Sequence, residues 1–459
     1  MPMEPHVVPR KQHRVSRKQV SPNALRTLYR LHSRGFIAYL VGGCVRDLLL
    51  GRTPKDFDIG TNATPGQIKR LFRNCRLVGR RFRLAHLHFQ DEIVEVSTFR
   101  RAADPSDIAD NQEEVPGRRH VRHLKDEHGM VLADNIFGDP EEDALRRDFT
   151  INALAYNIAD SSVVDYSTGL ADLKARLIRS IGDPRIRFTE DPVRMLRAVR
   201  FAASHDFEIE AQAWKCICEL SSTISRVSPS RLYEEIQKLF LLGFAAPTFV
   251  LLEKAGLLAS LFPDLGNWIQ AVSGRFELLK ANLARIDELF RSGTGATPAL
   301  LFAALFGPGI EDAALARHRE GIPRHQALEE MCAVFMDETI KNAQIPGRIG
   351  ARLGAIISLK TSLCKMPAKR PALIAARPEF AEALTYLNFA AQAQSEYRVP
   401  LEWWEAFLLE NPPVASAGES TDETPKKKRR RRRRRPRRAR EAAAMTQGDT
   451  IQEESNHGR

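Results

Sequence analysis

The chain has 459 residues, 43% of them hydrophobic, so it can bury a large core and should divide into about two to four domains. No apolar stretch approaches the roughly eighteen residues of a membrane helix, and no apolar segment follows the basic N-terminus, so we expect neither a membrane span nor a secretory signal. The six cysteines lack the paired spacing of a zinc site and fit a reduced, cytoplasmic compartment.

The net charge of +12 is concentrated near the C-terminus. Residues 426–440 contain thirteen Lys or Arg and no acidic residue, which leaves the rest of the chain close to neutral. Such a run cannot bury itself, so we expect residues 412–459 to form a disordered tail that binds the phosphate backbone of a nucleic acid. A solubility or targeting tail without a specific ligand is the alternative.

The first part of the chain has an α/β pattern, preceded by a basic leader at residues 1–21 that we expect to be flexible. Apolar periodicity and turn residues predict helices over 22–33, 45–50 and 65–73, and strands over 36–41, 57–59, 85–89 and 93–99. Residues 101–134 are polar and rich in Arg and His, and we interpret them as a mobile insert near the active site.

The rest of the chain is predicted to be helical. Amphipathic stretches occur at residues 193–204, 211–220, 229–242 and 246–255, and residues 275–410 continue in the same way. We therefore expect an α+β catalytic head with a mixed sheet over residues 22–182, a helical neck over 183–265, and a helical C-terminal body over 266–411.

Two short motifs in the predicted head indicate metal-assisted phosphoryl or nucleotidyl transfer. Gly42 and Gly43 end a predicted strand, where glycine lets the backbone approach a ligand and the following helix N-terminus attracts phosphate. Asp56 and Asp58 flank Phe57 in a predicted strand, so their side chains leave the same face. Two carboxylates on one rigid face can hold Mg²⁺ and leave positions open for phosphate oxygens.

Each motif alone has an ordinary interpretation, since an Asp-x-Asp often lies in a turn and Gly-Gly is common turn chemistry. Their combination with Arg46 and Asp47 in one strand–helix–strand unit favours the transferase interpretation. GGCVRDLLLG at residues 42–51, followed by DFD at 56–58, resembles the class II nucleotidyltransferases. This family comprises bacterial poly(A) polymerases and CCA-adding enzymes, and the resemblance extends from about residue 35 to residue 240.

The resemblance implies roles for further residues. Glu95 lies in an apolar predicted strand, where an unpaired carboxylate is costly, and matches a third metal-site acid; an edge-strand charge is the alternative. RRDFTIN at residues 146–152 matches the family motif RRDxxxN. This match implies that Asp148 belongs to the active site and that Arg147 and Asn152 position the nucleotide, and it leaves open whether Asp148 contacts metal or ribose.

EDPVRMLR at residues 190–197 resembles the base-reading motif EDxxR of the family. Asp191 can accept from an exocyclic amine while Arg194 donates to the neighbouring ring nitrogen, a pair of groups that adenine and cytosine share. Arg197 and Arg200 continue at a spacing of three along the helix and could reach phosphates, although a solvated basic face is credible for Arg200.

The choice between the two activities depends on LVGRRFRLAHL at residues 77–87, which resembles the signature of poly(A) polymerases. The basic tail supports the same choice, because a nonspecific grip suits varied RNA 3′ ends. We therefore expect an enzyme of RNA polyadenylation and turnover that adds AMP from ATP to RNA 3′ ends and releases pyrophosphate. Its two-metal Mg²⁺ site would lie at Asp56, Asp58 and Glu95, and Gly42, Gly43 and Arg46 would hold the triphosphate. The alternatives are a CCA-adding enzyme and a non-catalytic RNA-binding adaptor.

Overall fold

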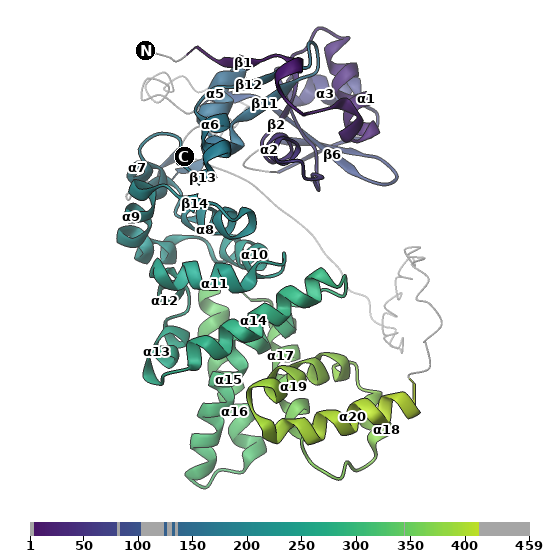
Figure 1. Cartoon of the computed structure of the whole chain (residues 1–459), viewed down its shortest axis with the longest axis vertical. Coiled ribbons are helices and arrows are strands. Elements are labelled where there is room, and N and C mark those ends of the chain that lie inside the picture. The colour runs from purple at the N-terminus through teal and green to yellow at the C-terminus, as the bar shows by residue number, and fades with distance from the viewer. Residues whose placement is uncertain are drawn as a thin grey trace, which may run out of the picture. The chain divides into compact units, whose positions relative to one another are not determined.

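The computed structural model describes residues 4–79, 83–101, 124–125, 131–133, 136–343 and 345–412 (Figure 1). Most of the predicted insert at 101–134 and the predicted tail from residue 413 onward lie outside the described residues. Arg80, Arg81 and Phe82 of the segment 77–87 lie outside them as well.

An eight-stranded mixed sheet forms the scaffold of the first region, with the strand order β1-β12-β11-β2-β3-β6-β5-β4. Strands β3 and β6 run parallel, and the other neighbours in this sheet are antiparallel. The strands are β1 (His6–Val8), β2 (Ala38–Val41), β3 (Asp58–Thr61), β4 (Cys75–Val78), β5 (Leu84–His88), β6 (Ile93–Thr98), β11 (Leu154–Asn157) and β12 (Val163–Asp165).

Three two-stranded pairings complete the described strands: β7 (Arg100–Arg101) with β10 (Ile136–Phe137), β8 (Leu124–Lys125) with β9 (Val131–Ala133), and β13 (Leu177–Ile178) with β14 (Glu208–Ile209). The helices around the main sheet are α1 (Pro22–His32), α2 (Gly43–Leu50), α3 (Pro65–Leu71), α5 (Pro140–Leu145) and α6 (Gly169–Ala175). Helix α3 begins where the sequence predicts, because Thr64 and Gln67 form a capping box.

Residues 4–21 are part of the fold, so the expectation of a flexible leader is wrong. Strand β1 pairs antiparallel with β12 at the sheet edge, and two 3₁₀ helices follow at Arg10–Gln12 and Arg17–Gln19. Arg17 donates to the hydroxyl of Ser161 at 2.7 Å, and Val15 and Val20 are buried. These valines are scattered among basic residues, which is why no apolar pattern indicated a strand or a core contribution.

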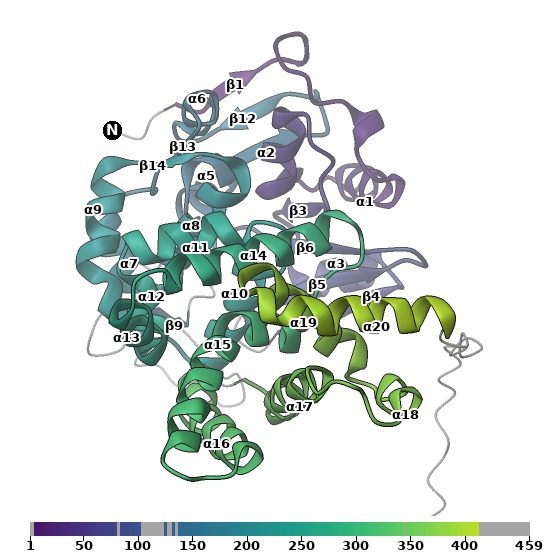
Figure 2. The same cartoon turned by 60° about the horizontal axis from the view of Figure 1, so that its bottom comes forward.

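From α7 onward the described structure is almost entirely helical. The helices are α7 (Pro184–Glu190), α8 (Val193–His205), α9 (Ala211–Leu220), α10 (Pro229–Phe240), α11 (Ala245–Lys254), α12 (Leu257–Leu261), α13 (Pro263–Ala271), α14 (Arg275–Arg291), α15 (Pro298–Arg319), α16 (Arg324–Ala343), α17 (Gly347–Leu363), α18 (Pro371–Ala375), α19 (Phe380–Ala393) and α20 (Arg398–Glu410). The remaining 3₁₀ helices are Thr150–Asn152, Ser221–Arg226 and Ser395–Tyr397. Helix α8 packs against α10 and α11, and α11 packs against α14 (Figure 2). The predicted α+β head and helical region are thus confirmed, whereas their boundaries stay predictions.

Helix α15 is long and apolar enough to cross a membrane by length and composition, with a mean hydropathy of 1.5, so the expectation that no stretch approaches this character is wrong. In the structure 61% of that apolar window is buried. The helix packs against α14, α16, α17 and α19, which is the placement of a core helix in a helical bundle.

Candidate active site

Most of the predicted site residues line one cavity of about 610 Å³. Its walls come from the start of α2, the start of β3, the segment 146–152, and helices α8 and α10. All residues predicted for nucleotide binding line it, together with Asp58 and Asp148. The lining residues that matter below are Gly42, Gly43, Arg46, Asp58, Arg147, Asp148, Asn152, Asp191, Arg194, Arg197, Phe201, Arg231 and Glu235.

Gly42 brings the N-terminus of α2 against an arginine. Its φ of 79° and ψ of −136° are strained for any residue with a side chain, and a Cβ there would lie 2.6 Å from a terminal nitrogen of Arg147. The first backbone N–H groups of α2 lack intrahelical partners, and the helix dipole favours an anion at this end. The glycine pair therefore leaves room for a phosphate group beside Arg147.

Asp58 and Glu95 are paired in register on the parallel strands β3 and β6, so their side chains leave the same face of the sheet. The predicted strand begins one residue later than expected, and Asp56 lies in the coil before it. Asp56 is nevertheless exposed while Phe57 is buried, so the alternation of faces continues through this segment. Burial raises the pKa of Asp58 to about 6, and the charges of Glu95 and Asp56 contribute in the same direction.

Glu95 is not an edge-strand charge, so that alternative is wrong. Strand β6 lies between β3 and β5 in the sheet. His86 stands opposite Glu95 on β5, and its Nε2 lies 3.4 Å from a carboxylate oxygen of Glu95. The Glu95 side chain is 40% exposed, so it can still accept a ligand. Sequence reasoning missed His86, although its place in an alternating strand could have indicated it.

Among the residues that the structure describes, no three His, Cys, Asp or Glu side chains are grouped as a metal site. Mg²⁺ usually binds through one or two carboxylates together with substrate phosphates, rather than in a cage of protein ligands. Burial is the main cause of the raised pKa of Asp58, and the charges of Glu95 and Asp56 raise it further, so a bound cation would stabilise the charged form of Asp58. The oxygen donors of this face therefore fit Mg²⁺.

Asp148 is surrounded by donors from the protein itself. Its Oδ1 accepts from the Phe149 backbone N–H at 2.9 Å and from Asn152 at 3.1 Å, and its Oδ2 accepts from Arg197 Nε at 2.6 Å. Burial alone would raise the pKa of Asp148, but Arg197 and the hydrogen bonds outweigh burial and lower this pKa to about 2. Asn152 in turn accepts from Arg46 at 2.8 Å. Asp148 therefore holds Asn152 and Arg197 in fixed positions on the polar wall of the cavity.

Phe201 is the centre of a cluster that sequence reasoning missed. The guanidinium carbons of Arg46, Arg197 and Arg200 lie 5.2, 5.4 and 4.5 Å from its ring centroid. Each arginine also pairs with its own carboxylate, on Asp47, Asp148 and Glu235 respectively. The side chain of Arg200 is only 16% exposed, so the alternative of a solvated basic face is wrong. Cation–π contacts with Phe201 thus hold two arginines of the cavity wall, Arg46 and Arg197, and place Arg200 behind them, outside the lining.

Asp191 has one satisfied and one unsatisfied oxygen. Its Oδ2 accepts from Arg231 of α10 at 2.9 Å, whereas Oδ1 is buried and has no hydrogen-bond partner among the described residues. A buried acceptor without a partner is costly, so a donor from a ligand would stabilise it. Arg194 donates from one nitrogen to the backbone oxygen of Arg187 at 3.0 Å and lies 3.6 Å from Glu190. Arg194 is thus held in place beside Asp191.

A mixed sheet that carries paired carboxylates beside a glycine-led helix and an arginine-lined cavity is an arrangement suited to a nucleotidyltransferase. Comparison with known proteins supports this class. Residues 38–179 match the family described as the poly A polymerase head domain. Residues 206–269 match a probable RNA- and SrmB-binding site of polymerase A, and residues 320–439 match the polymerase A arginine-rich C-terminus.

The chain is 41% identical over 412 residues to poly(A) polymerase I of Escherichia coli O6:H1, which covers 89% of this chain and 86% of that protein. A CCA-adding enzyme of Pediococcus pentosaceus is 37% identical over 219 residues, covering 48% of this chain and 50% of that protein. The solved structure of the Bacillus stearothermophilus CCA-adding enzyme in complex with CTP is similar, with a TM-score of 0.55 and 25% identity over 85% of this chain and 83% of that one.

The chain therefore belongs to the bacterial poly(A) polymerase family of nucleotidyltransferases, and its activity is the addition of AMP to RNA. This confirms the expected family and activity. CCA-adding enzymes are relatives that share the fold, and the alternative of a non-catalytic adaptor is set aside.

Proposed function

We propose that the cavity between the head and helices α8 and α10 is the active site in which ATP meets the RNA 3′ end, with Mg²⁺ held by Asp56, Asp58 and Glu95. The observation that carries this proposal is the register of Asp58, which lines the cavity, opposite Glu95 on the neighbouring strand β6. A divalent cation there would neutralise triphosphate charge and lower the pKa of the attacking 3′-hydroxyl.

The triphosphate is assigned to the start of α2 and its arginine neighbours. Gly43 offers a backbone N–H group at the start of α2, and Gly42, whose own N–H donates to the Leu154 backbone oxygen, adds no side-chain bulk. Arg46 and Arg147 supply positive charge from the cavity wall. Asp143 lies 3.1 Å from Arg147 and leaves part of this guanidinium facing the cavity. These groups bind and orient the triphosphate so that its α-phosphorus faces the 3′-hydroxyl.

The base is assigned to Asp191 and Arg194. The unsatisfied Oδ1 of Asp191 would accept from the exocyclic amine of adenine, and Arg194 would donate to the adjacent ring nitrogen. Asp148 acts as a positioning residue rather than a contact to metal or ribose, because its oxygens already accept from Arg197, Asn152 and the backbone. Arg197 is thereby held at the cavity wall.

Two broader parts of the proposal concern RNA and location. The thirteen basic residues at 426–440 would hold RNA phosphates without reading sequence, which suits an enzyme that extends varied 3′ ends. We also propose that the enzyme works in the cytoplasm, where ATP and RNA 3′ ends are both available.

The direct test of the activity is incubation of the purified chain with an RNA oligonucleotide, Mg²⁺ and each nucleoside triphosphate in turn. A long ladder of products with ATP alone is the expected result. Short additions that need CTP and a tRNA would instead identify a CCA-adding activity, and no extension with any nucleotide would contradict both.

A further inference from the structure

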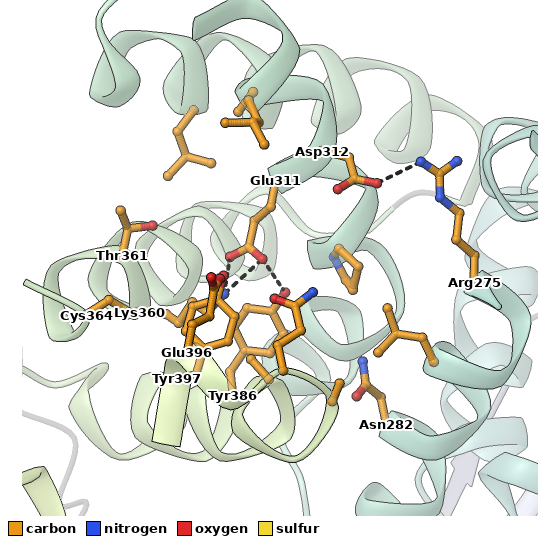
Figure 3. Close-up of a pocket in the computed structure, with 18 of the residues that line it drawn as sticks. Arg275, Asn282, Glu311, Asp312, Lys360, Thr361, Cys364, Tyr386, Glu396 and Tyr397 are labelled. Atoms are coloured by element: carbon orange, nitrogen blue, oxygen red, sulfur yellow. Dashed lines mark hydrogen bonds and ion pairs between the residues drawn. The ribbon is translucent and has the colours of Figure 1, made fainter. Parts of the chain in front are cut away.

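A second cavity, of about 550 Å³, lies in the helical body among α13, α14, α15, α17 and α19 (Figure 3). It shares no lining residue with the candidate active site. Its volume lies in the range of small-molecule sites, and charged and aromatic groups line it. Nothing in the proposed nucleotidyl transfer uses this cavity.

Helix α15 carries the sequence Gly307-Pro308-Gly309 in its continuous interior, and Pro308 lines the cavity. Pro308 has no N–H to donate to the backbone oxygen of Ala304, and the side-chain amide of Asn282 donates to that oxygen instead, at 3.1 Å. A Cβ at Gly307 would overlap the hydroxyl of Tyr386. Proline in a helix interior is strongly disfavoured, and the hydrogen bond from Asn282 offsets part of that cost here.

The residues just after Gly307-Pro308-Gly309 in α15 form a fixed polar floor of the cavity. Figure 3 shows Glu311 turned toward Lys360 and Tyr386, and Asp312 turned toward Arg275. Both carboxylate oxygens of Glu311 lie 3.0 Å from the Lys360 ammonium group, and the Tyr386 hydroxyl donates to one of them at 3.4 Å. Lys360 is only 4% exposed, whereas a quarter of the Glu311 side chain (25%) is exposed.

Asp312 and its neighbours fix one wall. Asp312 accepts from Arg275 at 2.8 Å and from the indole N–H of Trp268 at 3.1 Å. The Arg275 guanidinium also lies 4.4 Å from the Trp268 ring centroid. The wall is therefore held in one geometry before any ligand arrives, which reduces the entropic cost of binding.

The rim carries two exposed cations, Arg324 and Lys365, and one exposed carboxylate, that of Glu396. The side chains of Arg324 and Lys365 line the cavity, are exposed, and make no hydrogen bond or ion pair with any described residue. Gln394 stands on the same rim with a free amide among the described residues. The interior cations Lys360 and Arg275, in contrast, are occupied by Glu311 and Asp312.

We propose that this cavity binds one nucleoside phosphate, with its phosphate on Arg324 and Lys365 and its base directed toward Glu311. A carboxylate floor repels phosphate but accepts from an exocyclic amine, and a carboxylate can accept about four hydrogen bonds, of which described residues use three. Adenine carries such an amine and uracil does not. The nucleotide is either a unit of the RNA strand or a free mononucleotide, and this inference rests on the activity of the chain toward RNA.

The test compares two charge-reversal variants of the full chain. R324E with K365E alters the rim, and R319E with R377E makes the same charge change at exposed body positions outside the cavity. Binding of labelled oligo(A) and oligo(U) is measured without Mg²⁺ at several salt concentrations. If the ligand is a unit of the RNA strand, the rim variant should bind oligo(A) about tenfold more weakly, with a salt slope smaller by roughly 1.4 for two lost phosphate contacts, and the loss for oligo(U) should be smaller.

Two further measurements, the dependence of affinity on RNA length and the number of AMP sites per chain, distinguish an RNA nucleotide from a free nucleotide in the cavity. A primer-extension assay separately tests the AMP-adding activity on which the inference rests. If a nucleotide of the RNA strand occupies the cavity, the rim variant loses affinity for oligo(A) only when the RNA exceeds a threshold length. It then binds the same number of free AMP molecules per chain as the unaltered protein. If a free nucleotide occupies it, one AMP site per chain disappears while oligo(A) affinity is kept. Rim and control variants that agree in both measurements would overturn the inference. Both variants should still add AMP to a short primer. If the unaltered chain itself added no AMP, that result would refute the proposed activity and not the inference about the second cavity.

Discussion

Arg197 Nε lies 2.6 Å from Oδ2 of Asp148, and this contact joins helix α8 to the segment that follows α5. Asp148 is nearly buried, and its charge is the main influence that raises the pKa of Arg197. The pair is also linked through Asn152 to Arg46. The two regions that contribute to the cavity are therefore connected by a continuous set of polar contacts.

Asp148→Asn should disconnect these contacts while keeping the shape of the side chain. A partly buried arginine without its counter-ion is costly, so the free energy of unfolding should fall by about 3 kcal/mol. AMP addition should fall with it, because Arg197 loses its fixed position. Urea unfolding measures the first effect. Asp206→Asn is the matched control, since the Asp206 pair with Arg176 is exposed, and it should change stability by less than about 0.5 kcal/mol.

The effect of Asp148→Asn on the free energy of unfolding should depend on pH. The pKa of Asp148 is depressed to about 2 in the folded chain, below its ordinary value of 3.8, so its contribution to stability is fully present above pH 3.8 and disappears as the pH falls through 2. The stability difference between the unaltered chain and Asp148→Asn should therefore be constant near neutrality and shrink below pH 3.8. A difference that grows on acidification would show that the pair does not stabilise the fold.

Phe201→Leu should weaken the arginine wall while keeping an apolar side chain. Loss of three cation–π contacts should lower kcat/KM for ATP by roughly tenfold to a hundredfold, and Phe201→Tyr, which keeps a ring, should retain most activity. Phe207→Leu is the control, because Phe207 is similarly buried and no arginine contact to its ring is recorded among the described residues. Equal losses in the two leucine variants would indicate a packing effect only.

Asp191→Asn should alter base selection. The amide can turn its NH₂ group toward the base, where it would donate to the carbonyl of uracil or guanine instead of accepting from the amine of adenine. Competition between ATP and UTP or GTP should shift by about tenfold to a hundredfold toward the wrong nucleotides. Asp183→Asn is the control, since Asp183 caps α7 and asparagine caps a helix equally well. An unchanged preference in Asp191→Asn would remove Asp191 from base reading.

Deleting residues 426–459 should weaken RNA binding without abolishing catalysis. The deletion removes thirteen clustered positive charges from a chain whose remainder is nearly neutral. Each neutralised phosphate contributes about 0.7 to the log–log salt slope, so engagement of half the charges predicts a slope smaller by roughly four. RNA titration at several salt concentrations measures this slope. Superimposable salt plots for the two proteins would mean that the tail does not grip RNA.

The sequence predicted the alternation of strands and helices near the carboxylates well, because glycine, proline and capping residues punctuate that region strongly. Helix α3, which begins after the capping residue Thr64, is an example. The pairing of β1 with β12 was not predictable, because strand pairing across more than 150 residues leaves no local pattern in a basic leader.

The site was predictable where residues act through local motifs, and not where they act through tertiary contacts. The sequence motifs around Asp58 and Glu95 were enough to indicate that these carboxylates could bind a metal ion. Phe201 looks like an ordinary core residue in α8, and only the fold brings Arg46 of α2 onto its ring. In α15, the side-chain amide of Asn282 replaces the N–H that Pro308 lacks. This replacement likewise depends on a contact between two helices, α14 and α15.

The measurement that tests the proposed active site most directly is the rate of AMP addition by Asp58→Asn at saturating Mg²⁺, ATP and RNA. Loss of a metal ligand should remove several kcal/mol of transition-state stabilisation and lower the rate by about a thousandfold. The free energy of unfolding should not fall, because one of three mutually repelling carboxylates is neutralised, and RNA affinity should persist. Asp264→Asn, at an exposed position in α13, should behave like the unaltered chain. An Asp58→Asn variant that keeps more than about a tenth of the unaltered rate would contradict the assignment of this carboxylate to the metal site.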